Sequence, residues 1–224
     1  INNNHSLLFF GSTSGNGTGP NYYTNGHDVL QGIVENKLVN GYPVLATNTQ
    51  WRDPIYNRWS PASDESLKYL FNPNATEGEN GIEEVVTNAN YLFQMDADGY
   101  YYYDSGKNHA QLNTVTGEFT VYNERANNDS KAYFNPFGTG INSKFNYHFG
   151  MTVETSFVMP KDGKINGQDM VFEFSGDDDV WVFVDDVLVL DMGGIHQDQS
   201  GSINFATGAV IVNKEDNKVI STSL

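Results

Sequence analysis

The chain has 224 residues, with 28 acidic and 12 basic side chains, a formal net charge of −16 and no cysteine. This acidity argues against binding to nucleic acid and to anionic membrane surfaces, and the lack of cysteine excludes disulfides, thiolate catalysis and thiolate metal sites. The length suffices for one large β domain or two small ones, and no apolar run is long enough to insert into a membrane.

The first seventy residues predict short elements separated by polar loops. A strand is expected at 6–10, followed by a glycine-rich loop at 11–26. A helix capped by Asp28 is expected next, because apolar side chains follow at helical spacing. These side chains are Val29, Leu30, Ile33, Val34 and Leu38. A second short helix is expected to end at Phe71, before Pro73.

The middle of the chain predicts strands at 91–94, 100–103 and 118–122, joined by turns that contain glycine. The sequence Asp96-Ala97-Asp98-Gly99 is similar to the start of an EF-hand calcium loop. Its glycine comes too early, however, and no bidentate glutamate follows at the required distance. We therefore interpret this sequence as a hairpin turn.

The second half is predicted to be rich in β-strands, beginning at 149–159. Met170, Phe172 and Phe174 then recur every second residue, as on a half-buried strand. Every residue from Val180 to Val184 is apolar, which indicates a short strand buried on both faces.

Two hairpins are expected in this half. Asp185-Asp186 separates the apolar strand from a second one at 187–190, and aspartate can enter the left-handed region that such a two-residue turn requires. A later hairpin is expected from strands at 210–212 and 219–220.

These elements predict a mainly β fold. Because no long helices separate the strands, an antiparallel β-sandwich is favoured over a parallel sheet. We expect a single domain over 1–224, with an elaborated N-terminal half at about 1–148 that holds the few short helices. The β-sandwich core is expected at about 149–224.

Three adjacent carboxylates, Asp177, Asp178 and Asp179, lie between two apolar runs. Neighbouring carboxylates repel one another, so a fold that places them at a strand edge usually supplies a compensating cation. Ca²⁺ suits a shell of oxygen ligands with irregular geometry. The other interpretation is a solvated acidic loop without a metal ion.

The stretch 169–194 resembles a fibro-slime domain of bacterial surface proteins, which belongs to the wider protective-antigen-like group of β-sandwich modules. The matching elements are Gly176-Asp177-Asp178, Val184-Asp185, Val187–Leu190 and Gly193-Gly194-Ile195-His196. Asp186 stands where the family usually has glycine. A looser resemblance covers most of the chain, including 66–71, 98–105 and 201–208.

The resemblance implies a calcium site. In lectin members of the group, two aspartates joined by a cis peptide bond hold one Ca²⁺, which binds sugar hydroxyls directly. Asp177 and Asp178 would be that metal-binding pair here. The further candidate ligand-binding residues are Asp179, Trp181, His196 and Asp198. Asp179 can instead be a solvated residue, and His196 a structural one.

The resemblance also implies a shortened chain. Lectin members complete the calcium shell with a second loop, and fibro-slime domains have at least one further strand beyond the last predicted hairpin. This sequence stops at Leu224. We therefore expect truncation at the C-terminus, in a piece of a longer multidomain protein.

The function expected from the sequence is that of an extracellular cell-surface adhesin, anchored to a Gram-positive cell wall. It would recognise a glycan on a host cell, mucin or another microbe in a Ca²⁺-dependent manner. The alternative is a protein-binding or structural stalk module that binds no sugar. Catalysis is not expected, because the sequence has no nucleophile elbow, phosphate-binding loop or zinc signature, and its five histidines are scattered.

Overall fold

The computed structural model describes residues 29, 31–44, 46, 67–74, 84–123, 134–137, 149–193, 196–213 and 219–223. The described residues fall into two compact units. The 72–149 unit spans Asn72–Phe149, and the 150–224 unit joins Gly150–Leu224 to the described residues of Asn3–Phe71. None of the helices described is both long enough and apolar enough to cross a membrane.

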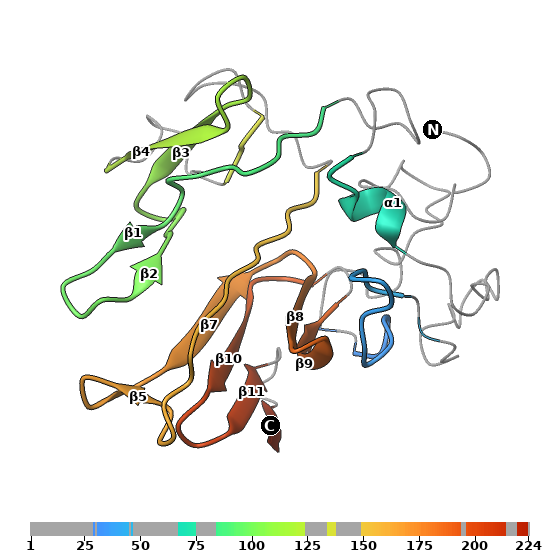
Figure 1. Ribbon diagram of the computed structural model, residues 1–224, viewed down its shortest axis with the longest axis vertical. Coiled ribbons are helices and arrows are strands. Elements are labelled where there is room, and N and C mark those ends of the chain that lie inside the picture. Colours follow the sequence, from blue (N-terminus) through green and yellow to red (C-terminus); the bar gives the residue numbers. More distant parts are fainter. Residues whose placement is uncertain are drawn as a thin grey trace. The chain divides into compact units, whose positions relative to one another are not determined.

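The 72–149 unit contains two antiparallel hairpins (Figure 1). The first pairs β1 (Gln94–Met95) with β2 (Tyr101–Tyr102), and the second pairs β3 (His109–Asn113) with β4 (Glu118–Tyr122). A small core of Leu92, Ala110 and Phe119 lies beside them. The turn between β1 and β2 is the one expected at 96–99, because the Asp96 carboxylate accepts hydrogen bonds from the backbone N–H groups of Asp98 and Tyr100.

The centre of the 150–224 unit is a four-stranded antiparallel sheet in the order β12-β11-β10-β7. Its strands are β7 (Val171–Gly176), β10 (Gln199–Asn204), β11 (Ala209–Asn213) and β12 (Val219–Ser223). The short hairpin of β5 (Lys164–Ile165) and β6 (Gln168–Asp169) precedes β7. The hairpin expected at 210–220 is therefore confirmed as β11 and β12.

A second hairpin, β8 (Val180–Val184) with β9 (Val187–Met192), packs against one face of this sheet. Leu190 and Met192 of β9 join Ile203, Val210 and Val212 of the sheet in one buried core. Gly201 is required at this contact, because a Cβ atom there would collide with the sulfur of Met192. The turn at Asp185 and Asp186 has φ values of 48° and 65°, which confirms the expected left-handed turn.

The helix predicted after Asp28 is wrong. The described residues 31–44 run as irregular backbone with isolated bridges, one of them pairing Lys37 with Val187. Gly32 adopts a φ of 82°, and its backbone N–H group donates to the Asp191 carboxylate. Ile33 and Val34 are buried as expected, but tertiary contacts rather than helical periodicity place them there.

The other sequence predictions have mixed outcomes. The short helix that ends before Pro73 is confirmed as α1 (Lys68–Phe71), and the fold class is mainly β with antiparallel strand pairing in all named sheets. The two-layer sandwich stays a prediction, as does the single domain.

The strand at 6–10, the loop at 11–26 and the N-terminal end of the second helix lie outside the described residues. The residues 149–159, expected to open the β-rich half, form no ladder.

Candidate functional site: an acidic loop between two strands

The acidic loop, defined here as Asp177, Asp178 and Asp179, connects the end of β7 to the start of β8. Asp177 and Asp178 are exposed, whereas Asp179 is half-buried. Gly176 pairs with Gln199 across β7 and β10, so Asp198 and His196 come from the same end of the sheet. The fold therefore gathers five of the six sequence-predicted site residues, all except Trp181, around one loop and one strand end.

The surroundings of the acidic loop raise the pKa of Asp178 above its ordinary value. Its side chain is exposed at the surface, yet nearby protein atoms remove part of its hydration, and this desolvation raises the pKa of the carboxyl group. The negative charge of Asp177 raises this pKa further, while His196 acts in the opposite direction. Within the described part of the chain, neither Asp177 nor Asp178 forms an ion pair with a lysine or arginine.

His196 is buried, with 3% of its surface exposed. Its Nδ1 atom lies 2.8 Å from the carbonyl oxygen of Gln197. Because a carbonyl can only accept, this contact places a proton on Nδ1. Among the described residues Nε2 has no hydrogen-bond partner. These contacts fit the structural interpretation of His196.

Asp198 contacts the neighbouring strand directly. The Ser175 hydroxyl donates to Asp198 Oδ1 at 2.9 Å. This hydrogen bond joins the residue before β10 to the end of β7, where Ser175 pairs with Ser200 in the ladder. Asp198 therefore links β7 and β10 at the end of the sheet where the acidic loop begins.

Trp181 points into a different environment from the acidic loop. Its indole N–H group donates to Asp191 Oδ1 at 3.0 Å, while the other carboxylate oxygen of Asp191 accepts from Gly32 N at 2.6 Å. The Gln31 side chain adds a hydrogen bond to the Asp191 carbonyl oxygen at 3.1 Å. These hydrogen bonds connect residues 31–32 to the β8–β9 hairpin. The hydrogen bond to Asp191 gives Trp181 a structural role, and a ligand contact by Trp181 stays a prediction.

Sequence reasoning missed Asp191, and the reason is a β-bulge. A regular ladder from the turn at 185–186 would place Leu190 opposite Trp181. The register shifts between Val182 and Phe183, so that Asp191 is the cross-strand partner of Trp181. The only signal in the sequence was an acidic residue that interrupts the apolar run of β9.

The acidic loop supplies an incomplete set of metal ligands. No group of three or more His, Asp or Glu side chains comes together around a possible metal position in the part of the chain that the structure describes. The peptide bond between Asp177 and Asp178 is trans, whereas the resemblance implied cis. An ion at this loop would therefore have two adjacent carboxylates and would take its remaining ligands from water and main-chain oxygens.

Comparison with known proteins shows similarity to Dictyostelium discoideum proteins. The chain is 32% identical to protein psiF over 184 residues, which is 82% of this chain and 23% of psiF. It is 26% identical to protein psiI over 87% of this chain and 26% of psiI, and 28% identical to protein psiK over 86% and 26%. The chain thus spans about a quarter of the length of these relatives. No family model matches the chain, and no solved structure matches it.

These comparisons overturn two expectations from the sequence. The resemblance to fibro-slime domains of bacterial adhesins is wrong, because the similar proteins are Dictyostelium psi proteins and no fibro-slime model matches. The predicted Gram-positive adhesin or lectin with Ca²⁺-dependent glycan recognition is contradicted by the same finding. Part of the resemblance rested on residues with ordinary structural tasks, such as the left-handed turn at Asp185 and Asp186.

Proposed function

We propose that this chain is a non-catalytic module of a longer extracellular protein, and that its acidic loop binds a divalent cation through Asp177 and Asp178. One observation carries the proposal. These two carboxylates are adjacent and exposed, and the pKa of Asp178 is raised by desolvation and by Asp177. A bound cation removes the repulsion that otherwise favours a proton on Asp178.

The ligand chemistry favours Ca²⁺. Carboxylate, carbonyl and water oxygens are hard ligands, and Ca²⁺ accepts six to eight of them in irregular geometry, whereas Mg²⁺ demands a near-ideal octahedron. Two protein carboxylates make a weak site. Ca²⁺ sites of extracellular modules have dissociation constants of about 10⁻⁴ to 10⁻³ M, so a site of this kind fills outside cells, where Ca²⁺ is abundant. The proposal therefore places this module outside the cell.

The proposal assigns no sugar to the ion. The relatives are about four times longer than the matched region, so the activity and partners of a whole protein of that length involve more than this module. What Asp177 and Asp178 would contribute is a fixed local charge at the end of β7. Ion binding there would stiffen the connection between the sheet and the β8–β9 hairpin.

Isothermal titration calorimetry with CaCl₂ tests the proposal. We expect saturable binding in the range of about 10⁻⁴ to 10⁻³ M and its loss in the double variant Asp177→Asn with Asp178→Asn. The matched control is Asp185→Asn with Asp186→Asn, which removes the same charge from the other end of β8 at positions where asparagine accepts the positive φ. At a free Ca²⁺ concentration ten times Kd, the unfolding free energy should rise by about 1.4 kcal/mol.

Two results would contradict the proposal. One is the lack of saturable binding up to about 10 mM CaCl₂, well above the expected range. The other is equal affinity in the wild type and in the variant at Asp177 and Asp178. Equal losses in both double variants would show a general effect of net charge rather than a site at the acidic loop.

A further inference from the structure

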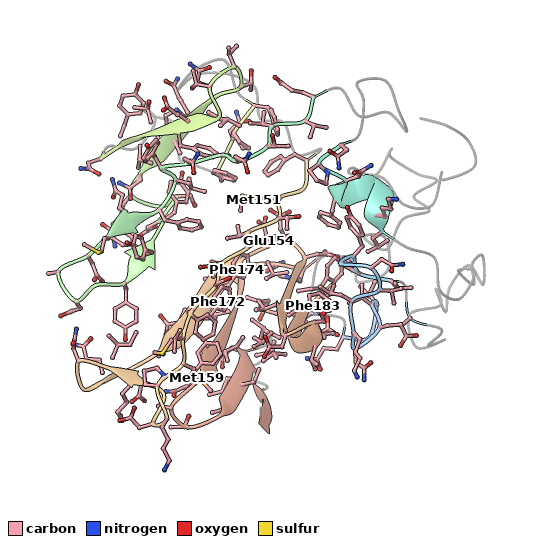
Figure 2. All side chains as sticks on the ribbon, viewed as in Figure 1. Met151, Glu154, Met159, Phe172, Phe174 and Phe183 are labelled. Carbon is pink, nitrogen blue, oxygen red and sulfur yellow. The ribbon has the colours of Figure 1, made fainter. Side chains whose placement is uncertain are left out.

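A buried histidine, His109, lies at the start of β3. It pairs across the ladder with Tyr122, the last residue of β4. Figure 2 shows side chains on both faces of this hairpin. Only 6% of His109 and 1% of the following Ala110 are exposed. Because successive side chains of a strand point to opposite faces, this end of β3 is covered on both sides.

The groups next to the His109 ring carry no charge. The Tyr122 ring stacks on it, with 6.2 Å between the ring centroids and 23° between the ring planes. The preceding residue, Asn108, is also buried, and its side-chain amide donates to Asn123 Oδ1 at 3.0 Å. In the described structure, His109 Nε2 has no hydrogen-bond partner. These surroundings suit a neutral imidazole ring.

The titratable groups on the neighbouring elements do not compensate a charge on His109. Asp104 and Lys107, in the turn before β3, form an ion pair with each other. Glu118 of β4 pairs with Asn113, at the opposite end of the ladder from His109. Burial raises the pKa of Tyr103 to about 12, so this side chain stays neutral. Within the described part of the chain, no carboxylate forms an ion pair with His109.

A second proton on His109 therefore destabilises the folded hairpin. The imidazolium has an N–H group at both ring nitrogens, so Nε2 would become a buried donor without an acceptor, whichever tautomer the neutral ring adopts. Burial also removes the water that stabilises the charge, which lowers the pKa of His109 below its ordinary value. In the unfolded chain the hydrated ring binds this proton at about pH 6.5. The stability that the neutral ring permits is thus complete above about pH 6.5 and decreases as the pH falls below it.

We propose that the β3–β4 hairpin is a pH-sensitive switch, which is closed at neutral pH and opens in mildly acidic surroundings when His109 takes up a second proton. Ala110 and Phe119 belong to this hairpin, so its opening disrupts the small core that they form with Leu92. The switch lies in the 72–149 unit, whereas the acidic loop belongs to the 150–224 unit. This assignment is therefore independent of cation binding at the acidic loop.

Hydrogen–deuterium exchange of the 224-residue chain at pH 7.5 and pH 5.5 tests the proposal, with the intrinsic pH dependence of amide exchange divided out. We expect the protection of the β3 and β4 amides to fall at least about 3-fold at the lower pH, with a limit of about 10-fold for one histidine. The matched control is His109→Phe, which keeps an aromatic ring beside Tyr122 but cannot ionise. This variant should retain its protection at pH 5.5. A loss below about 3-fold in the wild type, or equal losses in both proteins, would overturn the proposal.

An NMR titration of the wild-type chain makes the test independent of how well His109→Phe folds. The ring C–H signals of His109 report its protonation directly, and we expect a midpoint below about pH 6.5, the value of a hydrated imidazole. The amide signals of β3 and β4 should change in the same pH range, because opening of the hairpin is coupled to protonation. A midpoint at or above about pH 6.5 would show that the fold accommodates the imidazolium, and the proposal would then be wrong.

Discussion

Two aspartate sites lie near the start of β8 and differ in what surrounds the carboxylate, since Asp178 precedes this strand and Asp191 of β9 pairs with Trp181. Asp191 accepts hydrogen bonds from Gly32 N at 2.6 Å and from the Trp181 indole at 3.0 Å. Asp178 instead faces desolvation and the charge of Asp177, both of which raise its pKa. An aspartate side chain thus serves as a hydrogen-bond acceptor at Asp191, whereas at Asp178 it is a carboxyl group with a raised pKa.

The difference teaches how to separate a structural acid from a candidate binding acid. A carboxylate that accepts hydrogen bonds from N–H groups of the protein is stabilised in its charged form. A carboxylate beside a like charge gains from any cation or proton that arrives, so its environment favours a ligand. An acidic residue in the sequence does not reveal which case applies. One of the two groups that donate to the Asp191 carboxylate, Gly32 N, lies 159 positions away along the chain.

The largest expected effect is at Asp191. Asp191→Ala leaves Gly32 N and the Trp181 indole without their acceptor, and we expect a loss of about 2–3 kcal/mol in the free energy of unfolding. Urea denaturation monitored by tryptophan fluorescence measures it as a lower midpoint at unchanged slope. Asp177→Ala is the control and should change stability by no more than about 0.5 kcal/mol. Equal losses in the two variants would break the comparison.

A smaller effect is expected at Trp181. Trp181→Phe removes the indole donor to Asp191 but keeps an aromatic ring in the hairpin, and we expect a loss of about 1 kcal/mol. Calcium affinity in calorimetry should not change, because the indole points to Asp191 and not to the acidic loop. A clear fall in calcium affinity with unchanged stability would instead make Trp181 a binding residue, as the sequence analysis predicted.

The smallest expected effect is at Asp178, measured in metal-free buffer. Because the folded-state pKa of Asp178 is raised, the native state holds its proton more tightly than the unfolded state, and stability falls as the pH rises above the ordinary aspartate range. Asp178→Asn lacks this penalty. We expect it to be more stable than wild type at pH 7 by at most about 0.5 kcal/mol, since solvent screens so exposed a side chain.

The gain at Asp178 should vanish as the pH falls below that range, where the wild-type carboxyl group is protonated in both states. Denaturation midpoints of the two proteins at a series of pH values report the difference. A variant that is less stable than wild type at pH 7 would show that the Asp178 carboxylate makes a favourable contact, and the contrast with Asp191 would then fail.

Much of the β-rich half was predictable because its signals are local. The alternation of Phe172 and Phe174 gave β7, and the apolar run with its two-aspartate turn gave the β8–β9 hairpin. The strand β10 was harder to predict, because its sequence alternates small and polar residues around Gly201. The lack of a side chain at Gly201 makes room for Met192, so this position depends on a contact between the sheet and the β8–β9 hairpin.

The failure at residues 29–38 has the opposite cause. Five apolar residues at helical spacing predicted a helix. Such spacing indicates that side chains are buried, but it does not determine the backbone conformation in which they are buried. Gly32 takes a positive φ and donates to Asp191, and Lys37 forms a bridge with Val187. Contacts with a distant hairpin outweigh a helix propensity of a few tenths of a kcal/mol per residue.

The sequence by itself determined the mainly β class, the hairpin turn at Asp185 and Asp186, and the position of the acidic loop between two strands, because each depends on neighbouring residues. Only the tertiary structure decided which acids are structural. A single bulge in β8–β9 places Asp191 opposite Trp181, and Gly32 completes the contact. Such pairings depend on register and on contacts between distant segments, and no local pattern encodes them.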